Sequence, residues 1–325
     1  MILYIAESTD PTLNLAIEEC FLREYKEEVF MLWQNDNTIV VGKNQNTLAE
    51  INLDYVKTNG IRVVRRITGG GAVYHDMGNL NFTYITSCDG EWESDFSRFA
   101  TPVISALSKL GVKAEVSGRN DIVAEGRKFS GNAQTVVGGR LLHHGTILFN
   151  ADVSVLSEAL TPDPEKIQSK GIKSVSSRVV NLSELLPDGI DAKKLTSAIS
   201  EEARALYGAL EYKLSEAELS RAERLADEKY RTWEWNFGYS PKYTFTKKKR
   251  FGGGTINVFM TVTDGEIESA KIFGDFFGVG DVSDIETALV GKRHSEDSVR
   301  EIISQFKMGD YFGGISAEEI LEVLI

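Results

Sequence analysis

The stretch Arg65-Arg66-Ile67-Thr68-Gly69-Gly70-Gly71-Ala72-Val73-Tyr74-His75-Asp76 sets two guanidinium groups before three glycines, and an extended apolar segment follows. Glycine loses much backbone entropy on folding, so three in succession indicate a place where side chains do not fit. One such place is a loop whose N–H groups approach a phosphate or carboxylate, and arginines suit the same oxyanions. The alternative is a hairpin turn beside exposed arginines, which the triplet by itself favours because Gly-Gly is common in turns.

Strand patterns surround this loop. Residues 61–66 read as a strand leading into it, and apolar and polar side chains alternate over residues 80–85 after it. Further upstream, residues 30–34 and 38–41 are predicted to pair with each other around the polar turn at 35–37. The glycine loop is therefore expected to lie between strands on both sides.

Helical patterns are interspersed with the strands. Asp10 and Pro11 fit the N-cap and the first position of a helix, and Gly111 ends an apolar helical stripe over residues 96–110. Gly138-Gly139 is predicted as the turn of a later hairpin. Strands and helices interleave without a regular repeat, which favours the α+β class over a doubly wound parallel sheet.

A domain boundary is expected near Ser240-Pro241, giving a large domain of residues 1–241 and a small one of residues 242–325. The second part has its own strand and helix patterns, and Gly252-Gly253-Gly254 within it reads as a hairpin connection. At roughly 80 residues it is near the lower size at which a core is stable alone.

Composition limits the classes of function. The chain has 325 residues, 42% of them hydrophobic, and a formal net charge of −12, which argues against nonspecific nucleic-acid binding. No apolar run approaches the ~18 residues of a membrane span, and the first residues read as a strand and not as a signal peptide. Cys20 and Cys88 are too few for a disulfide framework, and Cys20 is expected to be a buried packing residue. We expect a cytoplasmic protein that binds neither membranes nor nucleic acids.

The glycine-loop stretch, continued by residues 75–79, resembles the signature of the lipoate–protein ligase A family. Other segments resemble that family in the same order along the chain: residues 14–19, 117–121, 127–133, 143–146, 171–179 and 233–238. The resemblance spans residues 4 to about 240. It implies a large mixed-sheet catalytic domain of the biotin/lipoate ligase type, which binds lipoate and ATP, followed by a small αβ accessory domain.

The resemblance also implies a reaction in two steps. The carboxylate of lipoate, or of octanoate, attacks the α-phosphate of ATP with Mg²⁺ present, and a lysine of an acceptor protein then takes the acyl group. The implied acceptors are lipoyl domains of 2-oxoacid dehydrogenase E2 subunits, the glycine cleavage H protein, or both. The first step concentrates negative charge, so such a site needs fixed cations and N–H donors.

Lys128 is the residue that the resemblance marks as catalytic, because the segment 127–131 matches the family's lysine segment. Without that match, a solvated surface charge would be the ordinary reading of a single lysine. The resemblance also implies that Arg66 contacts an ATP phosphate. Further residues carried over from the family are those of the loop: Gly69 and Gly70 along the lipoyl chain, and Gly71, Ala72, Val73 and Tyr74 against the adenylate.

Asn120-Asp121 has two readings that the sequence leaves open. The pair could orient a nucleotide-bound Mg²⁺, with Asp121 as the metal contact, or it could be a polar turn before a strand. For His75 and Asp76 the sequence also leaves two roles open: they could hold the loop by hydrogen bonds, or they could contact a ligand. His143-His144 invites a metal site, but neighbours on a strand face opposite ways and cannot chelate together.

Two alternative functions remain. The first is an ATP-independent octanoyl or lipoyl transferase that forms a cysteine acyl-enzyme, for which Cys88 would need a reactive thiol. The second is a noncatalytic lipoate carrier. Neither a Walker A pattern nor a Gly-x-Gly-x-x-Gly fingerprint is present, which argues against a P-loop or dinucleotide-binding enzyme.

Overall fold

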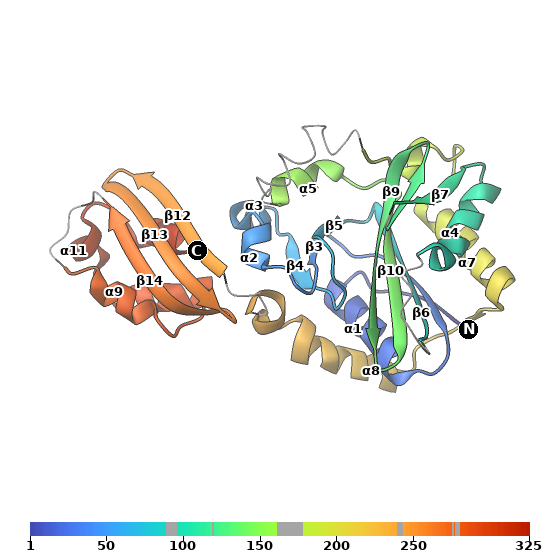
Figure 1. Cartoon of the computed structure of the whole chain (residues 1–325), viewed down its shortest axis with the longest axis horizontal. Helices are drawn as coiled ribbons and strands as arrows, with labels where there is room; N and C mark the ends of the chain where they lie inside the picture. Colours follow the sequence, from blue (N-terminus) through green and yellow to red (C-terminus); the bar gives the residue numbers. More distant parts are fainter. Residues whose placement is uncertain (89–95, 119, 161–177, 239–242, 275, 277–279) are drawn as a thin grey trace. The chain divides into compact units, whose positions relative to one another are not determined.

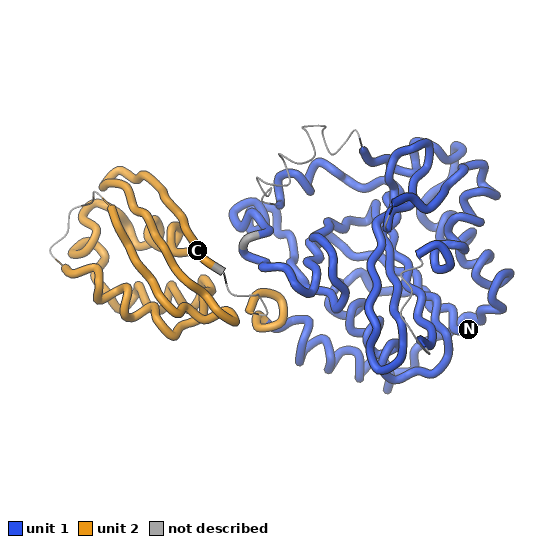
Figure 2. The backbone as a smooth tube through the Cα atoms, viewed as in Figure 1, with its two compact units in different colours: residues 1–232 blue, residues 233–325 orange. Residues whose placement is uncertain are grey.

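The computed structural model describes residues 1–88, 96–118, 120–160, 178–238, 243–274, 276 and 280–325. The chain divides into two compact units, Met1–Thr232 and Trp233–Ile325 (Figure 2). The boundary expected between residues 241 and 242, like the family-like segment 171–177, lies outside the described residues.

The first unit is built on an eight-stranded mixed sheet with the order β11-β1-β2-β6-β10-β9-β8-β7 (Figure 1). Its strands are β1 (Ile2–Ile5), β2 (Val29–Trp33), β6 (Asn79–Ser87), β7 (Ala114–Ser117), β8 (Asp121–Ala124), β9 (Arg127–Val137), β10 (Arg140–Leu148) and β11 (Leu210–Glu211). β1 runs parallel to its two neighbours, whereas the remaining pairs are antiparallel. The mixed sheet confirms the α+β class.

A second sheet of three strands, β4-β3-β5, carries the glycine loop. It consists of β3 (Thr38–Val41), β4 (Arg62–Arg65) and β5 (Val73–His75). The prediction that residues 30–34 pair with residues 38–41 is wrong, because β2 pairs with β1 and β6 while β3 pairs with β4 and β5. The polar turn between β2 and β3 thus carries the chain from one sheet to the other. The loop does lie between strands, as expected.

Helices pack around these sheets. They are α1 (Pro11–Glu24), α2 (Thr47–Glu50), α3 (Leu53–Thr58), α4 (Ser97–Lys109), α5 (Val153–Ala159), α7 (Ala192–Tyr207) and α8 (Glu216–Leu225), with short helical turns η2 (Leu182–Glu184) and η3 (Ala226–Tyr230). α4 and α7 lie side by side, and their apolar faces bury Val103, Leu107, Leu195 and Ile199 in the core of the large sheet (Figure 1). Gly111 follows α4 with a φ of 87°, as expected for a helix end.

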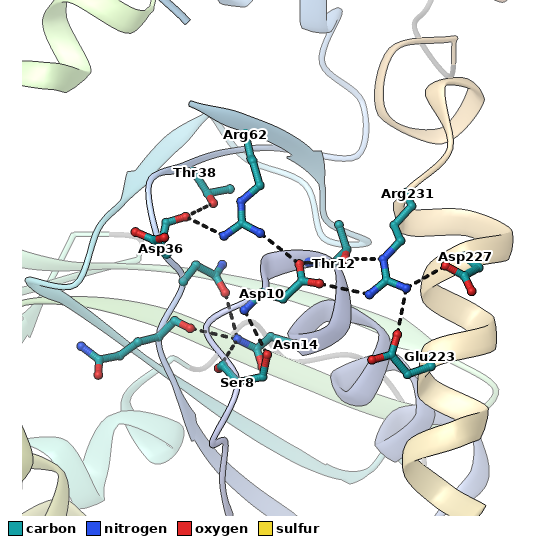
Figure 3. Close-up of polar contacts among 12 residues, drawn as sticks. Ser8, Asp10, Thr12, Asn14, Asp36, Thr38, Arg62, Glu223, Asp227 and Arg231 are labelled. Atoms are coloured by element: carbon teal, nitrogen blue, oxygen red, sulfur yellow. Dashed lines mark hydrogen bonds and ion pairs between the residues drawn. The ribbon is translucent and has the colours of Figure 1, made fainter. Parts of the chain in front are cut away.

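The start of α1 is fixed by a group of polar contacts (Figure 3). Asp10 Oδ1 accepts a hydrogen bond from the Thr12 N–H at 3.0 Å, and Asp10 Oδ2 lies 3.0 Å from Arg231 Nη2. Arg231 also pairs with Glu223 and Asp227. Although partial burial opposes it, these hydrogen bonds hold the pKa of Asp10 below its usual value. The N-terminus of α1 is thereby joined to the last turns of the first unit.

The second unit is a three-stranded antiparallel sheet covered by short helices. Its elements are η4 (Glu234–Gly238), β12 (Tyr243–Phe251), β13 (Gly254–Thr263), β14 (Glu266–Gly274), α9 (Ser283–Leu289), α10 (Glu296–Ile303), α11 (Met308–Phe312) and α12 (Ala317–Leu324). Gly252 and Gly253 connect β12 to β13 as a hairpin, and Gly254 begins β13, so the predicted hairpin is confirmed. In the described part of the chain, none of the helices combines the length and hydropathy that a bilayer crossing requires.

Candidate active site

Arg65 ends β4 and is fully buried. Its guanidinium donates hydrogen bonds to the carbonyl oxygens of Gly42, Lys43 and Gln45 at 2.7–2.9 Å, and to Thr47 Oγ1 at 2.7 Å. A buried cation needs such acceptors to offset its lost hydration. Arg65 therefore holds the segment that follows β3, and it does not line the cavities described below.

Arg66 holds the glycine loop itself. It donates hydrogen bonds to Val40 O (3.0 Å), Gly69 O (2.7 Å), Gly71 O (2.9 Å) and Thr68 Oγ1 (2.9 Å). Burial lowers the pKa of Arg66 to about 10, so the side chain stays charged at neutral pH. The hydrogen bonds to the carbonyl oxygens of Gly69 and Gly71 fix the backbone conformation of the glycine loop.

The glycine loop also packs tightly against the end of β3. A Cβ atom on Gly42 would lie 2.0 Å from Gly70 O and 3.0 Å from Gly70 C. Gly70 itself has a φ of 97°, a conformation that favours glycine. Gly42 is thus required by the close approach of two backbone segments, and Gly70 by its backbone conformation.

Lys128 is placed by an irregularity in β9. In the pairing of β8 with β9, Val123 opposes Lys128 and Ile122 opposes Ser130, so Phe129 is an extra, bulged residue. On the other side, the Lys128 N–H donates to Arg178 O. The Lys128 Nζ lies 2.7 Å from Asp121 Oδ1, and both side chains are a little over one third exposed.

Two cavities of the first unit meet at Lys128. They have volumes of about 220 and 280 Å³. Their shared lining consists of Ala72, Val73, Lys128, Gly131 and Thr146. The first cavity is also lined by Leu15, Trp33, Arg66, Gly70, His75 and His144, and the second by Tyr74, Asn79, Leu148, Val153, Leu156 and Val179.

Most of the sequence-predicted site residues line one or both of these cavities. Gly71 and Asn120 line the first cavity only, and the Asn120 Nδ2 donates to Asn132 O at 2.7 Å. Gly69 and Asp121 line neither cavity, although Asp121 reaches the junction through its ion pair with Lys128.

A buried chain of polar groups behind the first cavity was not predicted. The Thr68 hydroxyl accepts from Arg66 Nε and lies 2.7 Å from His144 Nε2. The His144 Nδ1 lies 2.9 Å from Glu18 Oε1, and a carboxylate oxygen accepts, so the Nδ1 carries a proton and donates. Thr83 donates to the same oxygen at 2.6 Å. The fully buried Glu18 thus offsets the charge of Arg66. Its sequence signals were an acidic residue beside an apolar helical stripe and its place in the family-like segment 14–19.

The two neighbouring histidines lie on opposite faces of β10, as expected. His143 stacks on Phe99 with ring centroids 4.9 Å apart, and its Nε2 lies 3.1 Å from Asn132 Oδ1. His144 instead faces the first cavity. Within the described residues, no group of three or more His, Cys, Asp or Glu side chains is arranged to hold a metal ion.

His75 also lines the first cavity, and its protonation can be derived from its neighbours. The Asn14 Nδ2 donates to the carbonyls of Ser8 and Gln34 and to Asn35 Oδ1, a set of contacts drawn in Figure 3. The Asn35 Nδ2 must then donate to His75 Nδ1, at 3.1 Å. The neutral ring consequently carries its proton on Nε2, which has no hydrogen-bond partner among the described residues.

The buried state of His75 predicts a pH dependence of stability. Burial lowers the pKa of His75 to about 3 from a usual value of 6.5, so the unfolded chain binds a proton that the folded chain does not. The free energy of unfolding should therefore fall as the pH falls below about 6.5, by about 2 kcal/mol at pH 5. Denaturant unfolding near pH 7.5 and pH 5 measures this. The His75→Gln variant should lack the contribution of His75 to this decrease in the free energy of unfolding. An equal decrease in both proteins would contradict a lowered pKa of His75.

Asp76 has a structural role in this region. Its Oδ1 accepts from the Gly78 N–H at 2.9 Å and its Oδ2 from the Asp152 N–H at 2.8 Å. The chain after β5 is thereby tied to the start of α5, which lines the second cavity through Val153 and Leu156.

Both cysteines lie away from the junction. Burial and the nearby carboxylates of Glu24 and Glu19 raise the pKa of the Cys20 thiol to about 12. Neither Cys20 nor Cys88 lines either cavity. The structure thus places no thiol where the expected ligand groups meet within the described residues.

Comparison with known proteins identifies the family of the chain. Residues 10–204 match the lipoyl protein ligase A/B catalytic domain, and residues 240–324 match the bacterial lipoate protein ligase C-terminus. The chain is 45% identical to lipoate-protein ligase LplJ of Bacillus subtilis (strain 168), over 97% of each chain.

Solved structures give the same result. A bi-partite lipoate protein ligase from Thermoplasma acidophilum, described with its E2 lipoyl domain, is 31% identical with a TM-score of 0.66, over 73% of this chain and 96% of that one. A lipoate-protein ligase A bound with ATP is 29% identical with a TM-score of 0.64, over 73% and 98% of the two chains. This chain therefore belongs to the lipoyl protein ligase A/B family, with the bacterial lipoate ligase C-terminal domain.

Proposed function

We propose that this protein is an ATP-dependent lipoate–protein ligase, which activates lipoate as an acyl-adenylate and transfers the acyl group to a lysine of a lipoyl acceptor domain. The observation that carries the proposal is the meeting of two cavities at Lys128 beside the glycine loop. An acyl-adenylate has two bulky parts joined at a phosphate. Two cavities joined at a cation match that arrangement.

The lining residues indicate which of the two cavities would bind the acyl chain and which the nucleotide. Gly70, expected along the lipoyl chain, lines only the first cavity, and Tyr74, expected against the adenylate, lines only the second; Gly71, also expected against the adenylate, lines only the first, next to Ala72 and Val73 that line both. The acyl chain is thus assigned to the first cavity and the nucleotide to the second. Arg66 contact with ATP phosphate stays a prediction, since four of its five N–H donors already bind the loop and Val40.

Lys128 is proposed to act in both steps. In the first, a carboxylate oxygen bonds to the α-phosphorus and the bond to pyrophosphate breaks. In the second, the acceptor amine bonds to the acyl carbon, the bond to AMP oxygen breaks, and the amine loses a proton. The ammonium has three N–H donors and Asp121 occupies one, which leaves two for the phosphate and the acyl oxygen.

Mg²⁺ would arrive with the nucleotide. Among the described residues, Asp121 is the carboxylate found beside Lys128, with Asn120 next to it, and Asp152 lines the second cavity. This fits Mg²⁺, which takes one or two carboxylates and completes its shell with phosphate oxygens and water. When bound, the ion would neutralise phosphate charge.

Mass spectrometry of an apo lipoyl domain incubated with the protein, lipoate, ATP and Mg²⁺ tests the proposal. A gain of one lipoyl group that requires ATP is expected. The E2 lipoyl domains and the H protein are the proposed acceptors, in the cytoplasm. Transfer without ATP that is lost on Cys88→Ala would indicate the cysteine transferase instead, and binding of lipoate without transfer would indicate a carrier.

A further inference from the structure

His143 is a fully buried polar residue of β10 with aromatic surroundings. Its ring lies against Phe82, Phe96 and Phe99, with ring centroids 4.9–5.6 Å apart. It lines neither of the two cavities. An apolar side chain could fill this place without the unfavourable desolvation of two ring nitrogens. The hydrogen bonds of the ring therefore indicate what His143 does.

The direction of these hydrogen bonds follows from one group that can only accept, the main-chain oxygen of Asn120. The amide group that faces it at 3.1 Å must be the Asn132 Nδ2. The Asn132 Oδ1 is then turned toward the His143 Nε2 at 3.1 Å, so this nitrogen carries a proton and donates. In the neutral ring the Nδ1 accepts, and the Gln134 Nε2 lies 3.0 Å from it. His143 thus fixes the orientation of the Asn132 amide.

Asn132 in turn holds Asn120. The Asn132 main-chain N–H donates to the Asn120 oxygen at 2.9 Å, and the Asn120 Nδ2 donates to the Asn132 oxygen at 2.7 Å. These two bonds and the one from the Asn132 Nδ2 join Asn120 to β9. Asn120 immediately precedes β8, whose first residue, Asp121, lies opposite Gly131 in the ladder. The beginning of β8 is therefore fastened to β9 by a side chain that His143 orients.

The Lys128 ammonium lies at the neighbouring position of the same ladder. Its Nζ is 2.7 Å from Asp121 Oδ1. A Cβ atom on Gly131 would lie 3.0 Å from the same Nζ, so the ammonium lies over the strand at Gly131. A shift of the beginning of β8 would consequently move the carboxylate that holds this ammonium.

We propose that His143 is a positioning residue of the active site. Through Asn132 it fixes the beginning of β8, and it thereby places the Asp121 carboxylate that holds Lys128. Gly145 agrees with this role, because a Cβ atom there would lie 2.1 Å from Asn132 Oδ1 and would displace the amide oxygen. The inference rests on the proposed ligase function.

Two substitutions of His143 separate its hydrogen bonds from its packing. Glutamine retains a donor and an acceptor, whereas leucine has neither, and both lose the ring that stacks on Phe99. Denaturant unfolding should therefore show lower stability for both variants. At temperatures where both are folded, kcat for lipoate-dependent pyrophosphate release should fall about 10-fold in His143→Leu and no more than about threefold in His143→Gln. The KM for lipoate should stay within about threefold of the wild-type value in both.

The route through Asp121 is tested by repeating the leucine substitution in an Asp121→Ala background. The carboxylate that His143 places is then absent, so adding His143→Leu should lower kcat by no more than about threefold. An effect that is only structural would instead lower kcat about 10-fold again, because independent effects multiply.

Asn132→Ala provides a second variant if His143→Leu does not fold. It removes the amide that joins His143 to Asn120, and it should lower kcat about 10-fold as well. An unchanged kcat in the folded variants, an equal loss in His143→Leu and His143→Gln, or an undiminished loss in the Asp121→Ala background would overturn the inference. Absence of pyrophosphate release by the wild-type protein would instead refute the ligase function itself.

Discussion

Lys128→Ala is expected to lower the rate of acyl-adenylate formation by about 10³-fold or more, since a positioned cation at developing phosphate charge has effects of this order. The fold should survive the change. The Lys128 side chain is 38% exposed and its ion pair with Asp121 is the only one found for it among the described residues. Such pairs contribute about 0–1 kcal/mol. Lipoate-dependent pyrophosphate release and denaturant unfolding measure the two effects.

Arg127→Ala is the matched control. Arg127 is the adjacent residue of β9, its side chain is 37% exposed, and it pairs with Glu184 at 3.4 Å. It lines neither cavity. Removing it should change the rate by no more than about threefold, as for surface charges away from a site. Normal pyrophosphate release by Lys128→Ala, or an equal loss in both variants, would refute the role given to Lys128.

Gly42→Ala is expected to produce the second large effect. The added Cβ would lie 2.0 Å from Gly70 O and 3.3 Å from Arg66 Nη2, so the glycine loop must move away from β3. The hydrogen bonds from Arg66 to the loop carbonyls would be lost or lengthened. We expect the free energy of unfolding to fall by about 1–3 kcal/mol and adenylate formation to fall about 10²-fold. Circular dichroism during denaturation and the pyrophosphate assay check the two values.

Gly252→Ala serves as its control in the other glycine triplet. An added Cβ there meets no atom within 4 Å, and Gly252 is not among the glycines with positive φ. Its effect on stability should stay within about 1 kcal/mol, in either direction. If Gly42→Ala matches Gly252→Ala in both stability and activity, the close packing of the glycine loop does not shape the site.

Local features were predictable because they depend on neighbours in the chain. The N-cap at Asp10, the helix end at Gly111 and the hairpin at Gly138-Gly139 all occur as predicted. Each requires only a short-range hydrogen bond or a backbone conformation that few residues adopt. The same holds for the opposite orientation of His143 and His144, which follows from the alternation of side chains along a strand.

Pairing between distant segments was not predictable in the same way. Residues 30–34 and 38–41 have the pattern of a hairpin, yet they belong to two sheets. The bulge at Phe129 that orients Lys128 depends on β8, and the pairing of Glu18 with His144 joins a helix to a strand far along the chain. A periodic pattern indicates which face of an element is buried. It does not indicate against which element.

The sequence by itself determined the class of fold and the family, because the glycine loop, the arginines and the lysine segment follow one another in the order that the family shows. It also predicted the residues that are proposed to carry the chemistry. Only the tertiary structure decided that Arg66 holds the loop from within, that two cavities meet at Lys128, and that His75 is left with an unpaired donor among the described residues. The physical reason is that hydrogen-bond satisfaction and cavity shape depend on atoms from separate segments, whose positions are set by packing of the whole domain.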